Sequence, residues 1–217
     1  MYIREYMVTP VITVTPDTLI DDALRTMHQH HIRRLPVVDE GKLVGLLTRN
    51  GLREATPPSS AIPLSIWGTH YQLSKMKVRD VMITDVITVT PDTTVEEASA
   101  LVEKHRIGTL PVIDKSKNLV GIITSTDLLH LMAQVLGFGQ KGVRLHIFGC
   151  SGGTEGVCHR RVMEVLSKHP IEILSAFPVK LADTEREDFI VHLDTEDAEP
   201  IVNELKKLGL EVEVRKH

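Results

Sequence analysis

Cysteine and aromatic residues are scarce in this chain of 217 residues, which has one tryptophan, four phenylalanines, three tyrosines and two cysteines. Cys150 and Cys158 are too few for the disulfide framework of a small secreted domain, so inert thiols in a reducing compartment are the simpler expectation. Residues 1–10 carry charges where a signal peptide needs an apolar run. No stretch reaches the roughly 20 apolar residues of a membrane span. These features predict a cytoplasmic protein with no membrane partner.

An excess of positive charge is also missing, since the formal net charge is −4. Nucleic acid is therefore not expected as a partner, because neutralising phosphates needs a basic face. The sequence shows no nucleophile with a base, no paired carboxylates and no metal cluster, so we expect no enzyme, no cofactor and no metal. An apolar content of 42% and a charged content of 25% are typical of globular domains.

An internal repeat organises the first two-thirds of the chain. Residues 7–18 and 82–93 read MVTPVITVTPDT and MITDVITVTPDT, with ten of twelve positions identical at an offset of 75. The match continues from IRRLPVVD (32–39) to IGTLPVID (107–114), and from LVGLLTRNGL (43–52) to LVGIITSTDL (119–128). Each copy predicts the order β-α-β-β-α, with Thr18 and Thr93 capping the first helix. A single copy is too small for a large core, so we expect the two to pack as a pseudo-twofold pair.

These anchors resemble the CBS motif, and the two copies together resemble a CBS pair, or Bateman module. The resemblance covers residues 1 to about 136 and assigns residues 1–55 to the first motif and 79–137 to the second. Residues 56–78 lie between them, and the apolar spacing from Leu64 to Leu73 predicts a covering helix there.

The C-terminal segment, residues 143–217, has a different pattern. Its expected order is β-α-β-β-α-β, with a glycine-rich turn after the first strand, and this is the ferredoxin-like arrangement of an α+β protein. The segment resembles an ACT domain. The whole chain resembles the acetoin-utilisation AcuB-like family, whose members are regarded as regulatory.

The clearest candidate site is GIITSTD (121–127). In CBS pairs the aspartate of this motif, here Asp127, holds the ribose of an adenosine nucleotide, and the hydroxyls of Thr124 and Thr126 lie at a helix N-terminus that favours phosphate. The adenine is expected between apolar residues of both copies, including Ile32 and Ile122. The alternative is that Asp127 is only a helix cap.

The resemblance implies that basic residues before LPVV reach the phosphate, and in this chain they are Arg33 and Arg34. They are expected to come from the copy opposite Asp127. The alternative is a solvated helix end. The equivalent second pocket has Gly51 in place of the aspartate, and Gly108 and Thr109 in place of the arginines, so one good pocket is expected.

The turn GCSGGTEG (149–156) is the other candidate. In ACT domains this loop contacts an amino acid, which here implicates Gly149, Ser151, Gly152, Gly153 and Thr154. The alternative is a turn without a ligand. Cys150 and Cys158-His159 fit no usual zinc spacing. His146 and His192 are expected on neighbouring strands, on an exposed or dimer-covered face, with a metal as the weaker alternative.

The expected function is a non-catalytic sensor of AMP, ADP, ATP or a related adenosyl ligand, with possible amino-acid binding by the ACT-like domain. A homodimer that acts on a regulated protein is expected. The alternative is a structural oligomerisation protein with vestigial pockets.

Overall fold

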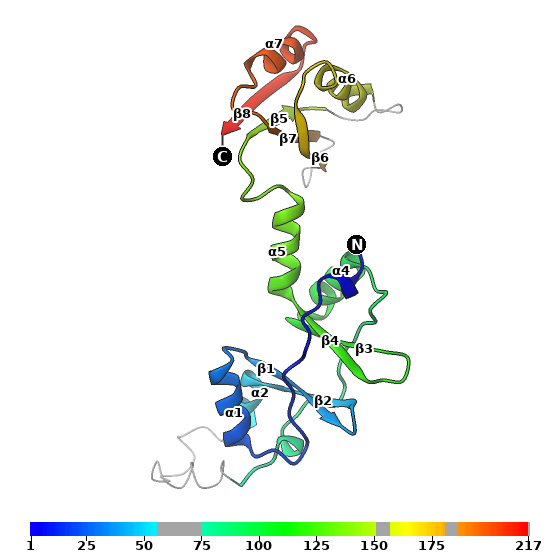
Figure 1. Ribbon diagram of the computed structural model, residues 1–217, viewed down its shortest axis with the longest axis vertical. Coiled ribbons are helices and arrows are strands. Elements are labelled where there is room, and N and C mark those ends of the chain that lie inside the picture. Colours follow the sequence, from blue (N-terminus) through cyan, green and yellow to red (C-terminus); the bar gives the residue numbers. More distant parts are fainter. Residues whose placement is uncertain (56–74, 151–156, 181–185, 217) are drawn as a thin grey trace. The chain divides into compact units, whose positions relative to one another are not determined.

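The computed structural model describes residues 1–55, 75–150, 157–180 and 186–216, which form two compact units, Met1–Leu129 and His130–His217 (Figure 1). The helix expected between Leu64 and Leu73 lies outside the described residues. Among the described helices, none is long and apolar enough to cross a membrane.

The two sequence repeats fold alike. The first contains α1 (Ile20–Gln29), β1 (Arg34–Asp39), β2 (Lys42–Thr48) and α2 (Arg49–Ala55), and the second contains α4 (Val95–His105), β3 (Thr109–Ile113), β4 (Leu119–Thr124) and α5 (Ser125–Val135). Each strand pair is an antiparallel hairpin. Glu40 and Gly41, with φ of 47° and 82°, make the turn of the first hairpin, as the Glu-Gly pair predicts.

The first strand expected in each repeat, VITV, is reduced to one parallel bridge. Val14 pairs with Val37, and Val89 pairs with Val112. Val14 and Val89 are both buried, so the apolar pattern predicts burial correctly at these positions even though no full ladder forms. The first repeat's core gathers α1, the hairpin and α2 around residues such as Ile20, Leu35 and Leu47.

The segment that precedes each repeat packs on the other repeat. The turn η1 (Ile3–Glu5) lies against the second repeat, where Ile3 N donates to Thr93 O at 2.9 Å and Val8 bridges to Ile122. The turn η2 (Val78–Asp80) lies against the first repeat, where Val78 N donates to Thr18 O at 2.9 Å. Ile3 and Val78 are fully buried. The dark blue N-terminal segment in Figure 1 can be followed from α4 to α1.

The helix caps differ from the expected ones. Thr94 and Glu97 form the capping box of α4, one residue after the expected pair, and α1 begins after Leu19 with no side-chain cap. The reason is that the hydroxyls of Thr18 and Thr93 are used in the preceding turn, where they accept from the amides of Thr15 and Thr90, each at 3.0 Å.

The second unit has the expected order β-α-β-β-α-β. Its elements are β5 (Val143–Phe148), α6 (Val157–Leu166), β6 (Glu172–Lys180), β7 (Glu187–Asp194), α7 (Glu199–Lys207) and β8 (Glu211–Lys216). The sheet order is β6-β7-β5-β8, with every neighbouring pair antiparallel. Apolar residues of β5 and β7 form one core with those of α6 and α7, so the helices cover one face of the sheet.

Candidate functional site

The arginines Arg33 and Arg34 lie where the first hairpin meets α2. Arg34 pairs with Thr48 across β1 and β2, so the start of one strand and the end of the other meet at one edge. The amide of Arg49 donates to the carbonyl of Arg33 at 3.0 Å, which ties the helix start to the same edge. The antiparallel register therefore places these polar residues together within the first repeat.

The second repeat builds the matching edge from Gly108, Thr109, Thr124 and Ser125. Thr109 pairs with Thr124, and the amide of Ser125 donates to the carbonyl of Gly108 at 3.2 Å. The Arg34 side chain crosses to this edge, and its Nη1 lies 3.5 Å from the same carbonyl oxygen. A Cβ atom added to Gly108 would lie 2.7 Å from Arg34 Nη2, so the glycine leaves room for the guanidinium group.

A cavity of about 740 Å³ opens between the two edges. The segment before VITV in the second repeat forms one wall, because Ile83 exchanges two backbone hydrogen bonds with Leu46 at 2.8 and 2.9 Å. The described lining residues are Ile20, Leu24, Arg33, Arg34, Leu46, Thr48, Arg49, Asn50, Leu52, Ile83, Asp85, Val86, Ile87, Arg106, Ile107, Gly108 and Thr109. They combine an apolar surface from both repeats with four guanidinium groups and one carboxylate.

The structure divides the predicted nucleotide-binding residues between two places. Arg33 and Arg34 line this cavity together with Thr48, Gly108 and Thr109. The cavity is therefore the second pocket, which the sequence predicted to lack arginines. The reason is the hairpin register, which keeps the arginines next to the Thr48 of their own repeat. Ile122, Thr124, Thr126 and Asp127 are not among the described residues that line this cavity, and Ile32 lies on the wall of a second cavity.

Asp127 lies in the first turn of α5 in the structure. Its Oδ2 accepts from the amide of Thr124 at 2.8 Å and from the Thr124 hydroxyl at 2.7 Å, and its own amide donates to that hydroxyl at 3.3 Å. Asp127 is the third residue of α5 and completes a capping box with Thr124, so Thr124 and not Asp127 is the N-cap, and the ribose contact of Asp127 stays a prediction. In the first repeat the amide of Gly51 makes the matching bond to the Thr48 hydroxyl at 3.0 Å, without a carboxylate.

Three charged residues of the cavity were missed from the sequence: Arg49, Arg106 and Asp85. Arg106 is the C-cap of α4 and has the left-handed conformation, with φ of 51°, and His31, one residue past the C-cap of α1, has φ of 53°. The repeat alignment matches these two positions, so applying it to the loops as well as to the motif residues would have drawn attention to Arg106.

In the second unit, the strand end before the glycine-rich turn is held by a buried carboxylate. Asp188 is 1% exposed; its Oδ1 accepts from the amide of Gly149 at 2.8 Å and from Arg186 Nε at 2.8 Å, and its Oδ2 lies 2.9 Å from His146 Nε2. The Arg186 guanidinium, followed by the Gly149 amide and His146, lowers the pKa of Asp188 to about 2. Of the predicted loop, Gly149 is described, whereas Ser151, Gly152, Gly153 and Thr154 lie outside the described residues.

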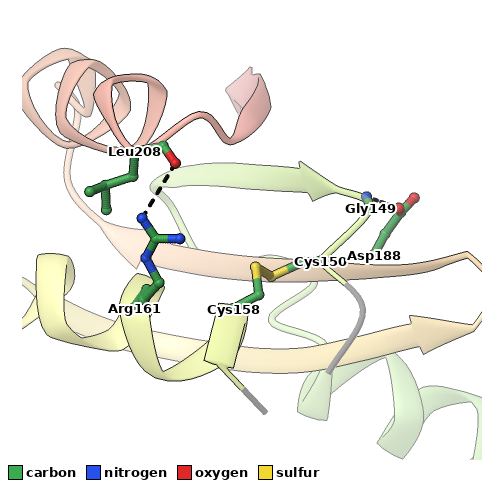
Figure 2. The surroundings of a disulfide bond; sticks show 6 residues. All are labelled: Gly149, Cys150, Cys158, Arg161, Asp188 and Leu208. Carbon is green, nitrogen blue, oxygen red and sulfur yellow. Dashed lines mark hydrogen bonds between the residues drawn. A yellow bond between two sulfur atoms is a disulfide. The ribbon is translucent and has the colours of Figure 1, made fainter. Parts of the chain in front are cut away.

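The expectation of free thiols is wrong in the structure. Cys150 and Cys158 form a disulfide that joins the end of β5 to the first turn of α6 (Figure 2). Their Cα atoms lie 5.4 Å apart, because the strand end and the helix start are neighbours in space although eight positions separate them in sequence. His146 and His192 are on neighbouring strands as expected, but His192 is fully buried rather than exposed.

A family model described as CBS domain matches residues 3–57 and 78–134. A CBS domain-containing protein of Dictyostelium discoideum is 36% identical over 135 residues, which are 62% of this chain and 92% of that protein. An inosine-5'-monophosphate dehydrogenase of Thermoplasma acidophilum is 30% identical over 96% of this chain, but the chain spans only 36% of that enzyme's length.

Three solved structures resemble this chain over the repeats. The CBS domain pair of protein MJ0100, in complex with 5'-methylthioadenosine and S-adenosyl-L-methionine, is 28% identical and covers 62% of this chain and 97% of its own, with a TM-score of 0.51. The protein CBSX2 in complex with AMP is 25% identical and covers 62% and 98%, with a TM-score of 0.52. A candidate acetoin utilization protein (AcuB) from Vibrio cholerae is 30% identical and covers 63% and 93%, with a TM-score of 0.53.

Proposed function

Because the chain belongs to the CBS domain family, we propose that its first unit is a regulatory, non-catalytic sensor that binds an adenosine nucleotide in the arginine-lined cavity. The observation that carries the proposal is the composition of the cavity wall. Apolar side chains from both repeats suit an adenine ring, and the guanidinium groups of Arg33, Arg34, Arg49 and Arg106 suit phosphate. The adenosyl ligands of the related CBS pairs support the same ligand class.

Charge favours a phosphate-bearing ligand among the adenosyl compounds. S-adenosylmethionine carries a net positive charge at neutral pH and methylthioadenosine carries no charge, so neither neutralises the arginines. AMP, ADP and ATP do, because their phosphate oxygens match the donors of a guanidinium group. We therefore place AMP, ADP and ATP ahead of the sulfur-containing nucleosides for this cavity.

Ile122, Thr124, Thr126 and Asp127 are proposed to form a second nucleotide site on the other repeat, with Ile32 on its apolar side. Arg34 is the basic residue best placed to serve it, because its guanidinium group lies 3.5 Å from the Gly108 carbonyl of that repeat. A ribose hydroxyl there would compete with Thr124 for the carboxylate of Asp127.

Calorimetric titration of the full chain with AMP, ADP, ATP, S-adenosylmethionine and methylthioadenosine tests the proposal. We expect heat and a raised melting temperature with the phosphorylated ligands. The double variant Arg33→Ala/Arg34→Ala should weaken AMP at least about tenfold, because each charge-assisted hydrogen bond is worth about 1.5–3 kcal/mol. Lys104→Ala, on the exposed part of α4, is the control for loss of one charge. No binding of any adenosyl ligand would favour the structural alternative, an oligomerisation protein with vestigial pockets.

The second unit is proposed to be an ACT-like domain that binds an amino acid or another small metabolite and takes part in a homodimer. Its element order and sheet order are compatible with that family, and Gly149 lies at the expected ligand loop. A cytoplasmic location remains a proposal that rests on the sequence features described above, and a regulated partner protein and a role in acetoin utilisation remain proposals that rest on the AcuB-like resemblance. Light scattering measures the oligomer directly, and a species of one chain, 24.2 kDa, would contradict the homodimer.

A further inference from the structure

The charge of the nucleotide cavity is larger than one phosphate group requires. The described residues that line it carry four arginines against a single carboxylate, Asp85, which leaves an excess of three positive charges. A phosphate monoester carries about two negative charges at neutral pH. One phosphate therefore neutralises only part of this charge.

A second cavity lies beside the first, and Arg49 lines both of them. It has a volume of about 620 Å³ and shares Leu24 and Arg49 with the nucleotide cavity. Its other described lining residues include the cationic Arg25 and the partly apolar His28 and Met27, with Asp21 as its carboxylate. Arg49, the first residue of α2, thus lies where the two cavities meet. The phosphate chain of a nucleotide that extends out of the first cavity would pass its guanidinium group.

We propose that the nucleotide cavity selects the di- or triphosphate over the monophosphate, and takes it without a bound divalent cation. This inference rests on the proposed function and adds to it the length of the phosphate chain and its metal state. Each further phosphate adds about one negative charge, so ADP and ATP match the excess of three better than AMP does. Arg49 is the residue assigned to the terminal phosphates.

The same charges exclude the magnesium complex. Mg²⁺ binds nucleotides through their phosphate oxygens and is held in proteins by carboxylates that complete its shell. In this cavity those oxygens face guanidinium groups, which repel the cation and compete for the same lone pairs. Asp85 is the one carboxylate among the described lining residues. Free ATP should therefore bind and Mg-ATP should bind poorly.

Titration of the full chain with adenosine, AMP, ADP and ATP, each with EDTA and with excess magnesium chloride, tests the inference. We expect ATP and ADP to bind about tenfold more tightly than AMP in EDTA, as one added charged contact predicts. Magnesium should weaken ATP about tenfold and leave AMP unchanged, because AMP holds the ion weakly.

Two variants assign the effect to its residue. Arg49→Gln should weaken ATP about tenfold and AMP hardly at all, whereas Lys104→Gln should change neither; circular dichroism checks that both fold. AMP binding as tightly as ATP, or ATP binding that magnesium does not weaken, would overturn this inference and leave the proposed function standing. Failure of every adenosine nucleotide to bind would overturn the proposed function itself.

Discussion

Two glycines at equal positions of the repeats explain how tightly the exchanged segments pack. A Cβ atom at Gly121 would lie 2.4 Å from Met7 Sδ, and one at Gly45 would lie 2.6 Å from Met82 Sδ and 3.0 Å from the Ile83 carbonyl oxygen. Both contacts are made by residues of the segment that precedes the other repeat. The shared glycine of LVG is therefore a packing requirement and not a turn.

Gly45→Ala and Gly121→Ala should each lower the free energy of unfolding by about 1–3 kcal/mol, because the methyl group overpacks a close contact. Gly45→Ala should cost more, since a backbone oxygen cannot move aside as a methionine can. Denaturant unfolding measures both. Gly51→Ala, in helix α2 with only the Thr48 hydroxyl within reach at 3.1 Å, is the matched control and should be neutral or slightly stabilising. A loss in the control equal to the other two would contradict the packing argument.

Asp188 should make the second unit sensitive to acid. Its pKa is about 2 when folded and 3.8 when unfolded, so the carboxylate contributes its full stabilisation above about pH 5 and loses it as the pH falls through 4 toward 2. The size is about 2 kcal/mol. Asp188→Asn should remove that much at pH 7 and flatten the dependence between pH 5 and pH 2, which unfolding at several pH values measures. An unchanged acid profile in the variant would show that other carboxylates govern it.

The helices are capped unequally. α4 has the full box of Thr94 and Glu97, with amide-to-side-chain distances of 2.9 and 3.2 Å, and α1 has none. Thr94→Ala should cost about 1 kcal/mol, and Thr94→Ser should recover most of it, because the hydroxyl and not the methyl group makes the bond. Unfolding by denaturant distinguishes the two variants. Equal losses would mean that the methyl packing of Thr94 matters more than its cap.

The sequence predicted elements better than it predicted the contacts between them. The repeat and its periodicities placed the hairpins, the helices and the order of the second unit, because these depend on local pattern. The prediction that the VITV segments form strands was wrong, because a buried apolar run has the same sequence pattern whether it forms one bridge or a full ladder. Arg33 and Arg34 were found from the motif, but their placement with Thr48 follows from hairpin register, and Arg49 and Arg106 were not among the predicted site residues.

At the scale of the molecule, the two units are stabilised by different features. The first is closed by exchanged segments and has the arginine-lined cavity, and the second has the Cys150–Cys158 disulfide. The sequence did not predict this disulfide, because two cysteines on either side of a glycine-rich turn match no known disulfide framework. Only the fold brings the two sulfur atoms together.

Reductant and nucleotide should therefore act on different unfolding transitions. Reducing the disulfide should destabilise the second unit by about 2–3 kcal/mol, the loop-closure value for a short loop, and leave the first unit's transition unchanged. Saturating nucleotide should raise the first transition only. Calorimetric scans with and without a phosphine reductant and ATP measure both, and the Cys150→Ser/Cys158→Ser variant should match the reduced protein. A single transition that moves with either addition would show that the units unfold together.

The exchange of the leading segments also bears on the order in which the chain can fold during synthesis. The amide of Ile3 donates to the carbonyl of Thr93, which is synthesised ninety residues later. The first repeat must likewise wait for Val78 before its core is closed. Neither repeat is therefore a complete folding unit during translation, and the high contact order predicts that both reach the native state together, late and cooperatively. A single repeat expressed alone would lack the segment that completes its core. It could complete that core only by exchanging leading segments with a second copy of itself.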